Sequence, residues 1–492
     1  MNTYRILITA ILFSAYSWCY SQSLQEMITI AKHQSLDASY IKHKRVNAEL
    51  AYKYYRANLL PEIKLTSIPM RYSSDVVERY SYDDDRTVYR AQQSLYSATN
   101  VMLKQNVGFL GGYVYMESDL RYYRTLQNET SQFTSVPFRI GYNQNLLGYN
   151  PYKWARKVEK MNLSLSEKET AAGLEEIAIE TINRYFTIVI LKEQLKQART
   201  KFLTCDSLYQ TGVYRSKLGG ISNSDLYELK IERNRSETEI VELGSKIETE
   251  KFSFAQFLQL TDTTLFHFEV PTDVRDIDVP LDKAQNLALE NSSLILNCKK
   301  SKIQNEQAEA QAKTQRFLEA SLSVNVGWHQ VADNFRGVYK GLLNEQSALV
   351  NVTIPLADFG RRKTQLAQIR ENIELDIINE KKATDNVIEE VVGRVSYMTI
   401  NRRKVNSCAE TYELAQMFYK EALESYKLGR NPFSKVCEAL IRQRMALADY
   451  YNAMRDYWVN YYEIRRMTLY DFEKGCGIYK MNKSPHEKGR FL

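Results

Sequence analysis

The sequence is poor in cysteine and proline, and beyond its first residues it contains no long apolar run. Its 6 cysteines are widely spaced and none forms a C-x-x-C pair, so neither a zinc site nor a disulfide framework is indicated. After Ser21 no stretch of about 18 consecutive apolar residues occurs, so we expect no membrane-spanning helix in the mature chain. If that chain spans a membrane, it must do so with strands.

The sequence also lacks the motifs of enzymes. None of its 5 histidines has a metal-ligand spacing such as H-E-x-x-H, and neither a nucleotide-binding glycine loop nor a nucleophile elbow occurs. The adjacent carboxylates Glu175-Glu176 and Glu389-Glu390 lie in helical sequence, where we expect solvated helix faces. We therefore predict no catalytic residue, no metal and no cofactor, and a protein that is not an enzyme.

Clustered positive charge is missing as well. The formal net charge is +7, from 66 Lys and Arg against 59 Asp and Glu, with both signs interspersed. A nucleic-acid groove gathers its basic residues on one face, so no nucleic-acid partner is expected. The 35 tyrosines suit surfaces that are apolar and wet together.

The N-terminus has the pattern of a secretory signal. A positively charged start, Met1 to Arg5, precedes the apolar run Ile6 to Tyr16, and Cys19-Tyr20-Ser21 supplies a plausible cleavage site. An uncleaved anchor or a lipid-modified Cys19 is the alternative. We expect residues 1–21 to be a signal peptide and the mature chain to be exported.

An internal repeat dominates the rest of the chain. Tyr185 and Tyr397 occupy matching segments, Lys217-Leu218-Gly219 is matched by Lys427-Leu428-Gly429, and Leu147 to Asn150 is matched by Leu356 to Gly360. The matches recur in the same order about 210 residues apart, a period too long for a solenoid. The pattern indicates one domain-sized unit that has been duplicated.

Each copy is predicted to contain a helix, a β section, a very long helix, a sharp turn and a last helix. The first helices are expected at Ser23–Asn58 and Leu281–Gln315, and no proline interrupts the two long helical regions. The resulting organisation is a first repeat at 22–260 (β section 61–147, helical hairpin 152–260), a linker at 261–280, a second repeat at 281–472 (β section 319–356, helical hairpin 361–472) and a polar tail at 473–492.

The hairpin helices show coiled-coil spacing, with apolar residues that advance by alternating threes and fours. A helix of about 60 residues is about 90 Å long, which no compact globular domain requires. This spacing favours an extended rod. The stripes run through Leu174, Ile177, Thr181, Tyr185, Ile188, Leu191, Leu195 and Ala198, and through Leu447, Tyr451, Met454, Trp458 and Tyr461.

The predicted strands alternate between apolar and polar residues. Leu322, Val324, Val326 and Trp328 share one face, and similar alternation occurs around Ile140 and Val352. Such segments are typical of outer-membrane barrels, although a half-buried soluble sheet alternates in the same way. We predict four strands per chain and a solvent-exposed loop from Ser73 to Ser97. Four strands cannot close a barrel, so copies of the chain must share one.

The organisation resembles that of the TolC-type outer-membrane efflux proteins over essentially the whole mature chain. The most specific local match is Ile354 to Arg362, which looks like the family's strand-to-helix junction, and Asn145 to Pro151 is its counterpart in the first copy. The resemblance implies an α+β membrane protein in which three protomers share a twelve-stranded barrel above a periplasmic α-helical tunnel. It further implies a passive exit duct in the outer membrane that works with a periplasmic adaptor protein and an inner-membrane pump.

The helix-to-helix turns have recognisable chemistry. Gly429 can end a helix in the left-handed conformation, Asn431 is expected to cap the next helix, and Pro432 is expected at its first position. In the first copy, Ser222 with Asp225 three residues later suits a capping box. The resemblance makes these turns adaptor-docking tips, formed by Lys217, Leu218, Gly219, Gly220, Ile221 and Ser222 and by Lys427, Leu428, Gly429, Arg430, Asn431 and Pro432.

The resemblance also places a periplasmic gate beside the turns, at Tyr426, Asp225 and Glu438. The sequence departs from the family pattern in having Asn431 where the latch carries arginine and Lys435 where it carries an acid, so Arg430 is the candidate substitute. An alternative function is that of a periplasmic coiled-coil adaptor or structural binding protein. The presence of two hairpins and of strands compatible with lipid favours the channel.

Overall fold

A computed structural model describes residues 23–81, 85–127, 129–146, 149–260, 268–269, 276–354 and 356–478. The predicted signal peptide, most of the linker 261–280 and residues 479–492 lie outside this part of the chain. The chain divides into two compact units. One comprises Met1–Val46, Leu165–Ile295 and Lys382–Leu492, and the other comprises Asn47–Ser164 and Leu296–Lys381.

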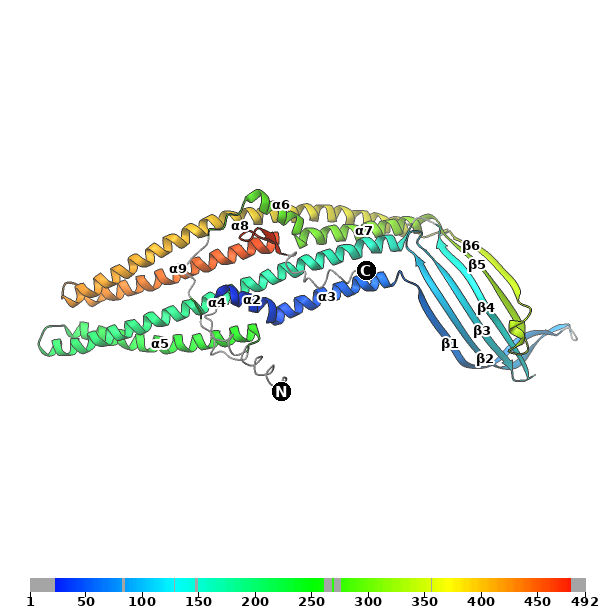
Figure 1. Cartoon of the computed structure of the whole chain (residues 1–492), viewed down its shortest axis with the longest axis horizontal. Coiled ribbons are helices and arrows are strands. Elements are labelled where there is room, and N and C mark those ends of the chain that lie inside the picture. Colours follow the sequence, from blue (N-terminus) through cyan, green and yellow to red (C-terminus); the bar gives the residue numbers. More distant parts are fainter. Residues whose placement is uncertain are drawn as a thin grey trace, which may run out of the picture. The chain divides into compact units, whose positions relative to one another are not determined.

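The helices come in pairs, and three of the four pairs have equal lengths. α2 (Leu24–Gln34) and α6 (Leu281–Asn291) have 11 residues each, α4 (Pro151–Lys217) and α8 (Arg361–Lys427) have 67 each, and α5 (Asn223–Leu258) and α9 (Phe433–Thr468) have 36 each. The remaining pair is α3 (Leu36–Ala57) and α7 (Ser293–Phe317). The α+β fold class with a duplicated unit is confirmed (Figure 1).

The first helix of each copy is broken where the sequence predicted a single helix. Ser35 ends α2 in an extended conformation, and Ser292 ends α6 with a ψ of 119°, which is not helical. The Ser35 hydroxyl then accepts a hydrogen bond from the Ala38 N–H at 3.1 Å, and the Ser292 hydroxyl accepts one from the Ile295 N–H at 3.3 Å. Each serine therefore caps the helix that follows, as serine favours.

The end of α9 also differs from expectation. The predicted helix to Phe472 stops at Thr468, because Leu469 adopts a left-handed conformation. β7 (Tyr470–Asp471) then pairs with β8 (Cys476–Gly477). The predicted tail therefore begins inside a small hairpin, in which the Glu473 N–H donates to the Tyr461 hydroxyl at 3.1 Å.

One antiparallel sheet contains six strands in the order β1-β2-β3-β4-β5-β6 (Figure 1). The prediction of four strands was wrong: the first copy supplies four and the second copy supplies two. Every neighbouring pair is antiparallel. The strands are β1 (Glu62–Ser81), β2 (Arg86–Val107), β3 (Gly112–Thr125), β4 (Thr130–Asn145), β5 (Glu319–Ala332) and β6 (Leu343–Thr353).

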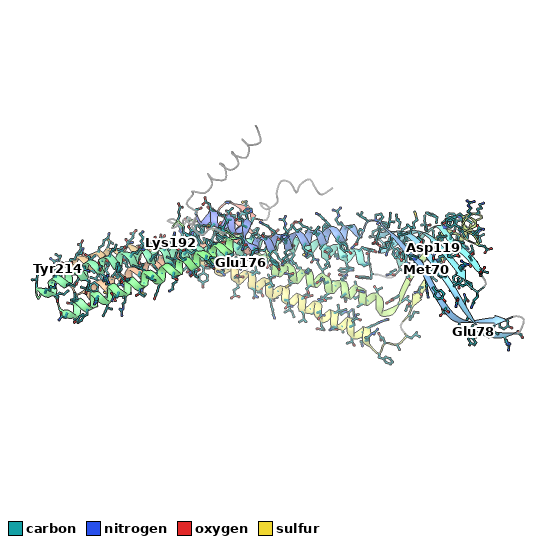
Figure 2. The ribbon with its side chains drawn as sticks, turned by 90° about the horizontal axis from the view of Figure 1, so that it is seen from below. Met70, Glu78, Asp119, Glu176, Lys192 and Tyr214 are labelled. Carbon is teal, nitrogen blue, oxygen red and sulfur yellow. The ribbon has the colours of Figure 1, made fainter. Side chains whose placement is uncertain are left out.

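The segment Ser73–Ser97 is not the predicted loop. β1 continues to Ser81 and pairs back onto β2 through Ser81 and Arg86. The β2–β3 ladder begins only at Ser94, so from Arg86 to Gln92 strand β2 pairs with β1 alone. These residues and their partners in β1 form a two-stranded ribbon that carries Glu78 (Figure 2). Most of the described side chains on both faces of this ribbon are exposed and none is buried, which explains why its sequence lacks the apolar alternation of the other strands.

The two faces of the sheet differ in chemistry. One row of cross-strand neighbours is apolar over five strands, and the next row in the same sheet carries charge. The first row consists of Ile63, Leu103, Met116, Ile140, Val326 and Gln346. The second row consists of Lys64, Met102, Glu117, Arg139, Gly327 and Glu345. Because adjacent positions along a strand point to opposite faces, these rows define an apolar face and a polar face.

Among the helices of the described residues, none has both the length and the hydropathy that crossing a bilayer requires.

The core of the first compact unit, which contains Leu165–Ile295, includes a buried charged group. Glu175 in α4 is 1% exposed, so the expectation of a solvated face was wrong for this carboxylate, whereas its neighbour Glu176 is exposed. Its carboxylate lies 2.6 Å from Lys32 Nζ in α2 and 3.0 Å from Arg465 Nε in α9. Elements from both copies therefore meet at one ion cluster.

Candidate functional site

The turn between α4 and α5 satisfies its own backbone groups. Gly219 adopts a left-handed φ of +71°, and the N–H groups of Gly220 and Gly219 donate to the carbonyls of Arg215 and Ser216. This pattern of crossed hydrogen bonds closes the C-terminus of α4. The Asp225 N–H donates to the Ser222 hydroxyl at 3.1 Å, so Ser222 caps α5 as predicted. The reverse contact of a full capping box is replaced by a 2.9 Å hydrogen bond from the Ser222 hydroxyl to the Asp225 carboxylate.

The turn between α8 and α9 repeats this geometry at its first half. Gly429 has a φ of +73°, and the N–H groups of Arg430 and Gly429 donate to the carbonyls of Ser425 and Tyr426. The second half differs from the prediction, because Pro432 occupies the N-cap and α9 begins at Phe433. Asn431 is therefore one residue too early to cap the helix, and no side chain caps it.

Both turns present a leucine to solvent at the same position. Leu218 is 86% exposed and Leu428 is 67% exposed, each directly after the last helical lysine. The glycines that follow have no neighbouring atom where a side chain would begin, so the turns are open on that side. Two small apolar anchors flanked by lysine thus lie at equivalent places in the two copies. A single exposed leucine is ordinary on a protein surface, so the distinguishing feature is its repetition at equivalent places in the two copies.

Beneath the turns, side chains from all four hairpin helices pack together. Cys205 of α4, Leu229 of α5, and Phe433 and Val436 of α9 are buried in one cluster. The Tyr426 ring of α8 lies against Phe433 with ring centroids 5.4 Å apart. The two hairpins therefore share a small apolar core near their closed ends.

Tyr426 and Asp225, the gate candidates that the resemblance places in different copies, influence each other electrostatically. Burial raises the pKa of the Tyr426 hydroxyl, and the nearby carboxylate of Asp225 raises it further. Arg215 acts in the opposite direction on the same hydroxyl. The half-buried Tyr426 thus keeps its proton and remains able to donate a hydrogen bond.

Glu438 is held by its own helix. Lys435 Nζ lies 2.9 Å and an Arg442 guanidinium nitrogen 2.7 Å from its carboxylate, and both hold the pKa of that carboxyl below its usual range. Arg430 is exposed on the turn. The structure therefore places Asp225 close enough to influence the pKa of Tyr426. Within the described residues, Tyr426 and Asp225 form no hydrogen bond, and Arg430 and Glu438 form no ion pair.

Farther from the turns than this cluster, a salt bridge links the two hairpins and a cavity lies between them. Arg444 of α9 forms a salt bridge with Glu239 of α5 at 2.5 Å. A cavity of about 540 Å³ lies between the four helices, and Lys201, Glu232 and Arg235 line it together with this pair. Sequence reasoning missed both features, because partners about 205 positions apart leave no local pattern.

A second candidate surface is the polar face of the sheet. Arg139 on β4 forms salt bridges of 2.7 Å with Glu117 on β3 and 2.6 Å with Glu345 on β6. To reach β6 it crosses β5 at Gly327, where a Cβ would lie 2.9 Å from the Arg139 Cβ. In the same way the Tyr115 ring covers Gly141, where a Cβ would lie 2.3 Å from the ring. Long polar side chains thus lie along this face instead of standing up from it.

Comparison with known proteins gives a match in structure but not in sequence. No protein-family model and no curated protein matches the chain. A membrane protein from Pseudomonas aeruginosa is 12% identical with a TM-score of 0.66, over 90% of this chain and 90% of that chain. This chain is also similar to the outer membrane protein VceC of Vibrio cholerae, with 13% identity and a TM-score of 0.63 over 91% of this chain and 95% of that chain. The CmeC outer membrane channel of Campylobacter jejuni is 14% identical with a TM-score of 0.62, over 94% of this chain and 90% of that chain. At these identities the likeness establishes the fold.

Proposed function

We propose that this chain, which has the fold of the TolC-type outer-membrane channels, is the passive exit duct of an efflux or secretion machine. The sequence-based resemblance in fold is confirmed. The function rests on one observation above all: the six-stranded sheet exposes an apolar face opposite a polar, ion-paired face. A soluble protein would cover the apolar face, whereas a lipid bilayer accommodates it.

The alternation along β5 shows how clear this separation is. Val326 and Trp328 are exposed on the apolar face, and Asn325 and Gly327 lie on the polar face. Lipid would contact Val326 and Trp328, and water would contact Asn325 and Gly327. A periplasmic adaptor or structural binding protein, the alternative function, gives no reason for six strands of this character.

Fractionation of cells tests the location. The protein is expected in the outer-membrane fraction, released by detergent but not by high salt or alkaline wash. Recovery in the soluble periplasmic fraction would contradict the channel and favour the adaptor.

The exposed stripes on two helices support an assembly of several copies. On α8, apolar side chains that are more than half exposed recur at Leu375, Tyr397, Ile400, Leu414 and Met417. On α3 they recur at Leu36, Tyr40, Leu50 and Tyr54. Tyr397 matches the fully buried Tyr185 in the other copy, so the same position is covered in α4 and left open in α8. We propose that a homotrimer covers these stripes.

Ile400→Glu is expected to convert the detergent-solubilised trimer largely into monomer. It would place a charge in each of three contacts, and burying an unpaired carboxylate costs more than one contact contributes. Size-exclusion chromatography with light scattering measures the mass. Ile400→Val, which keeps an apolar side chain, should remain trimeric; a trimer of Ile400→Glu with normal stability would remove α8 from the interface.

We propose that the turns are the docking tips for a periplasmic adaptor, which couples the duct to an inner-membrane pump. The exposed leucines and lysines of both turns supply the contacts. We also propose that the mouth closes next to them, with Tyr426 and Asp225 as the gate. Arg430 is then available for contacts outside a single chain, whereas Glu438 is paired within α9.

Tyr426→Phe combined with Asp225→Ala is expected to raise the closed-state current in planar bilayers by up to about five-fold, since a polar contact of ~1 kcal/mol biases an equilibrium by that factor. The phenylalanine keeps the packing against Phe433. Tyr214→Phe, at an exposed tyrosine of α4 (Figure 2), is the matched control and should leave the current unchanged. An unchanged current in the double variant would exclude these residues from the gate.

A further inference from the structure

The six-stranded sheet has two outer edges, and each is a whole strand. β1 pairs with β2 on one side and β6 pairs with β5, while the other side of each has no partner among the described residues. In a bilayer such edges leave backbone N–H and C=O groups without hydrogen bonds, a state that lipid does not tolerate. Both edges therefore require a partner strand.

We propose that β6 of one copy pairs with β1 of the next, so that three copies close a wall of 18 strands, six from each chain. This inference rests on the proposed function. It replaces the twelve-stranded barrel expected from the sequence. β1 and β6 are five antiparallel steps apart and hence antiparallel to each other, so every pair around the ring has the same geometry.

The even number of strands agrees with the chain's path. α3 leads into β1 and β4 leads out to α4, so the first copy must cross the sheet an even number of times to return to its helices. The second copy does so with two strands and the first with four. An additional hairpin is the smallest insertion that preserves this return.

The stagger of the strands indicates a closed barrel. Ile63 of β1 and Gln346 of β6 lie in the same cross-strand row, and the helices lie toward the start of β1 and the end of β6. Counted from this row toward the helices, β1 extends by one residue, to Glu62, and β6 extends by seven residues, to Thr353. The helix-side ends therefore shift by six residues over the five steps of the sheet. Continued to the next copy, the shift is about seven residues per chain.

This stagger corresponds to a definite tilt. At about 3.3 Å per residue and about 4.8 Å between strands, the observed shift gives a tilt of about 40°, within the 35–45° typical of barrels. With 18 strands the wall has a radius of about 18 Å, compared with about 12 Å for twelve strands at the same tilt. The exit would be about 1.5 times as wide.

The same shift explains the unequal lengths of the edge strands. The 11 residues of β6 would lie beside the part of β1 from about residue 63 to 73, so the rest of β1 would pair with β2 and have no neighbour on its outer edge. That end is the ribbon, which also has no β3 partner on its other side. The ribbon would therefore project beyond the wall in all three copies.

The polar face suits the inside of a wide wall. Arg139 lies across Gly327 and Tyr115 lies across Gly141, so the largest polar groups are held close to the backbone. Barrels of 16–18 strands leave an aqueous channel when their interior is not filled by side chains. The geometry thus favours passage of a bulky polar or amphiphilic cargo.

Disulfide cross-linking of the full-length protein in cells tests the edge contact. In a background with the other cysteines replaced by alanine, Asn351→Cys on β6 is combined with Lys64→Cys or Thr66→Cys on β1, positions that the shift places opposite each other on the polar face. Oxidation is expected to give covalent dimers and trimers on denaturing gels. Each single-cysteine variant is the control.

A competing pair identifies a narrower wall. If β1 and β2 lay outside the barrel, β3 would be the edge, and Asn351→Cys with Tyr115→Cys would cross-link instead. That result, or native trimers in which neither pair cross-links, would overturn the 18-stranded wall and leave the proposed function intact. A detergent-extracted monomer without cross-links would overturn both.

Discussion

Glu175→Gln is expected to be among the most destabilising single changes outside the sheet, with a loss of about 3–5 kcal/mol, the usual cost of breaking a buried ion pair. Glu175 is the carboxylate between two cations, Lys32 at 2.6 Å and Arg465 at 3.0 Å. Glutamine keeps the shape but removes the charge. The Lys32 ammonium would then be buried without its counter-charge. Burial lowers the pKa of Lys32, and Glu175 is the main group that raises it.

The cluster offers little compensation for that loss. Asp471, 3.1 Å from Arg465, is the other buried carboxylate, and it already accepts a hydrogen bond from the Tyr461 hydroxyl at 2.9 Å. The contact of Arg465 Nε with Glu175 is an ion pair without good hydrogen-bond geometry, so its strength is mainly coulombic. Removing the charge therefore removes most of the attraction.

The midpoint of thermal unfolding, followed by circular dichroism in detergent, measures the effect. Glu176→Gln is the matched control, because this neighbour is exposed and its 3.2 Å contact with Arg466 is a surface ion pair worth about 0–1 kcal/mol. Equal midpoints for the two variants would show that the cluster is not a stabilising link between the copies.

The repeat made most of the helical fold predictable. Matching short motifs about 210 residues apart set the positions of the turns, and proline-free stretches with a steady apolar spacing set the length of the long helices. The structure gives Lys217 and Lys427 as the last residues of two 67-residue helices, which are also the ends that the sequence indicates. Long periodic elements average over many residues, so single exceptions do not obscure them.

The errors have local physical causes. The ribbon of β1 and β2 buries neither of its sides, so the alternation that reveals a strand is missing between Ser73 and Gln93. Ser35 and Ser292 break their helices by capping the next turn, although serine is tolerated within helices. Glu175 and Glu176 are identical in sequence terms, and only the approach of Lys32 and Arg465 distinguishes them.

The candidate site was predictable in position but not in its contacts. Glycine followed by a capping residue identified both turns, and Ser222 caps α5 as expected. Pro432 takes the N-cap that Asn431 was expected to hold, because the two residues are adjacent and one step in register decides between them. The packing of Tyr426 on Phe433 and the Glu239–Arg444 bridge depend on the approach of two hairpins, which a single sequence does not encode locally.

Leu218→Glu combined with Leu428→Glu is expected to reduce adaptor binding at least about ten-fold, while the protein stays folded and trimeric. Each leucine would lose the contribution of a buried apolar side chain, about 1.5–3 kcal/mol, and about 1.4 kcal/mol corresponds to one factor of ten in affinity. Neither side chain belongs to the core, so the folded state loses little. The measurement is the amount of adaptor that co-purifies with the tagged channel, quantified by mass spectrometry.

Leu203→Glu separates docking from a general effect of added charge. This leucine is 68% exposed on α4, as exposed as Leu428, but lies well before the turn. If tip contacts decide binding, the control retains the adaptor and the double variant loses it, and each single tip variant gives an intermediate loss because both copies contribute. Equal retention by the double variant and the control would move the adaptor contact away from the turns. Equal loss would mean that the flank of α4, and not its end, carries the contact.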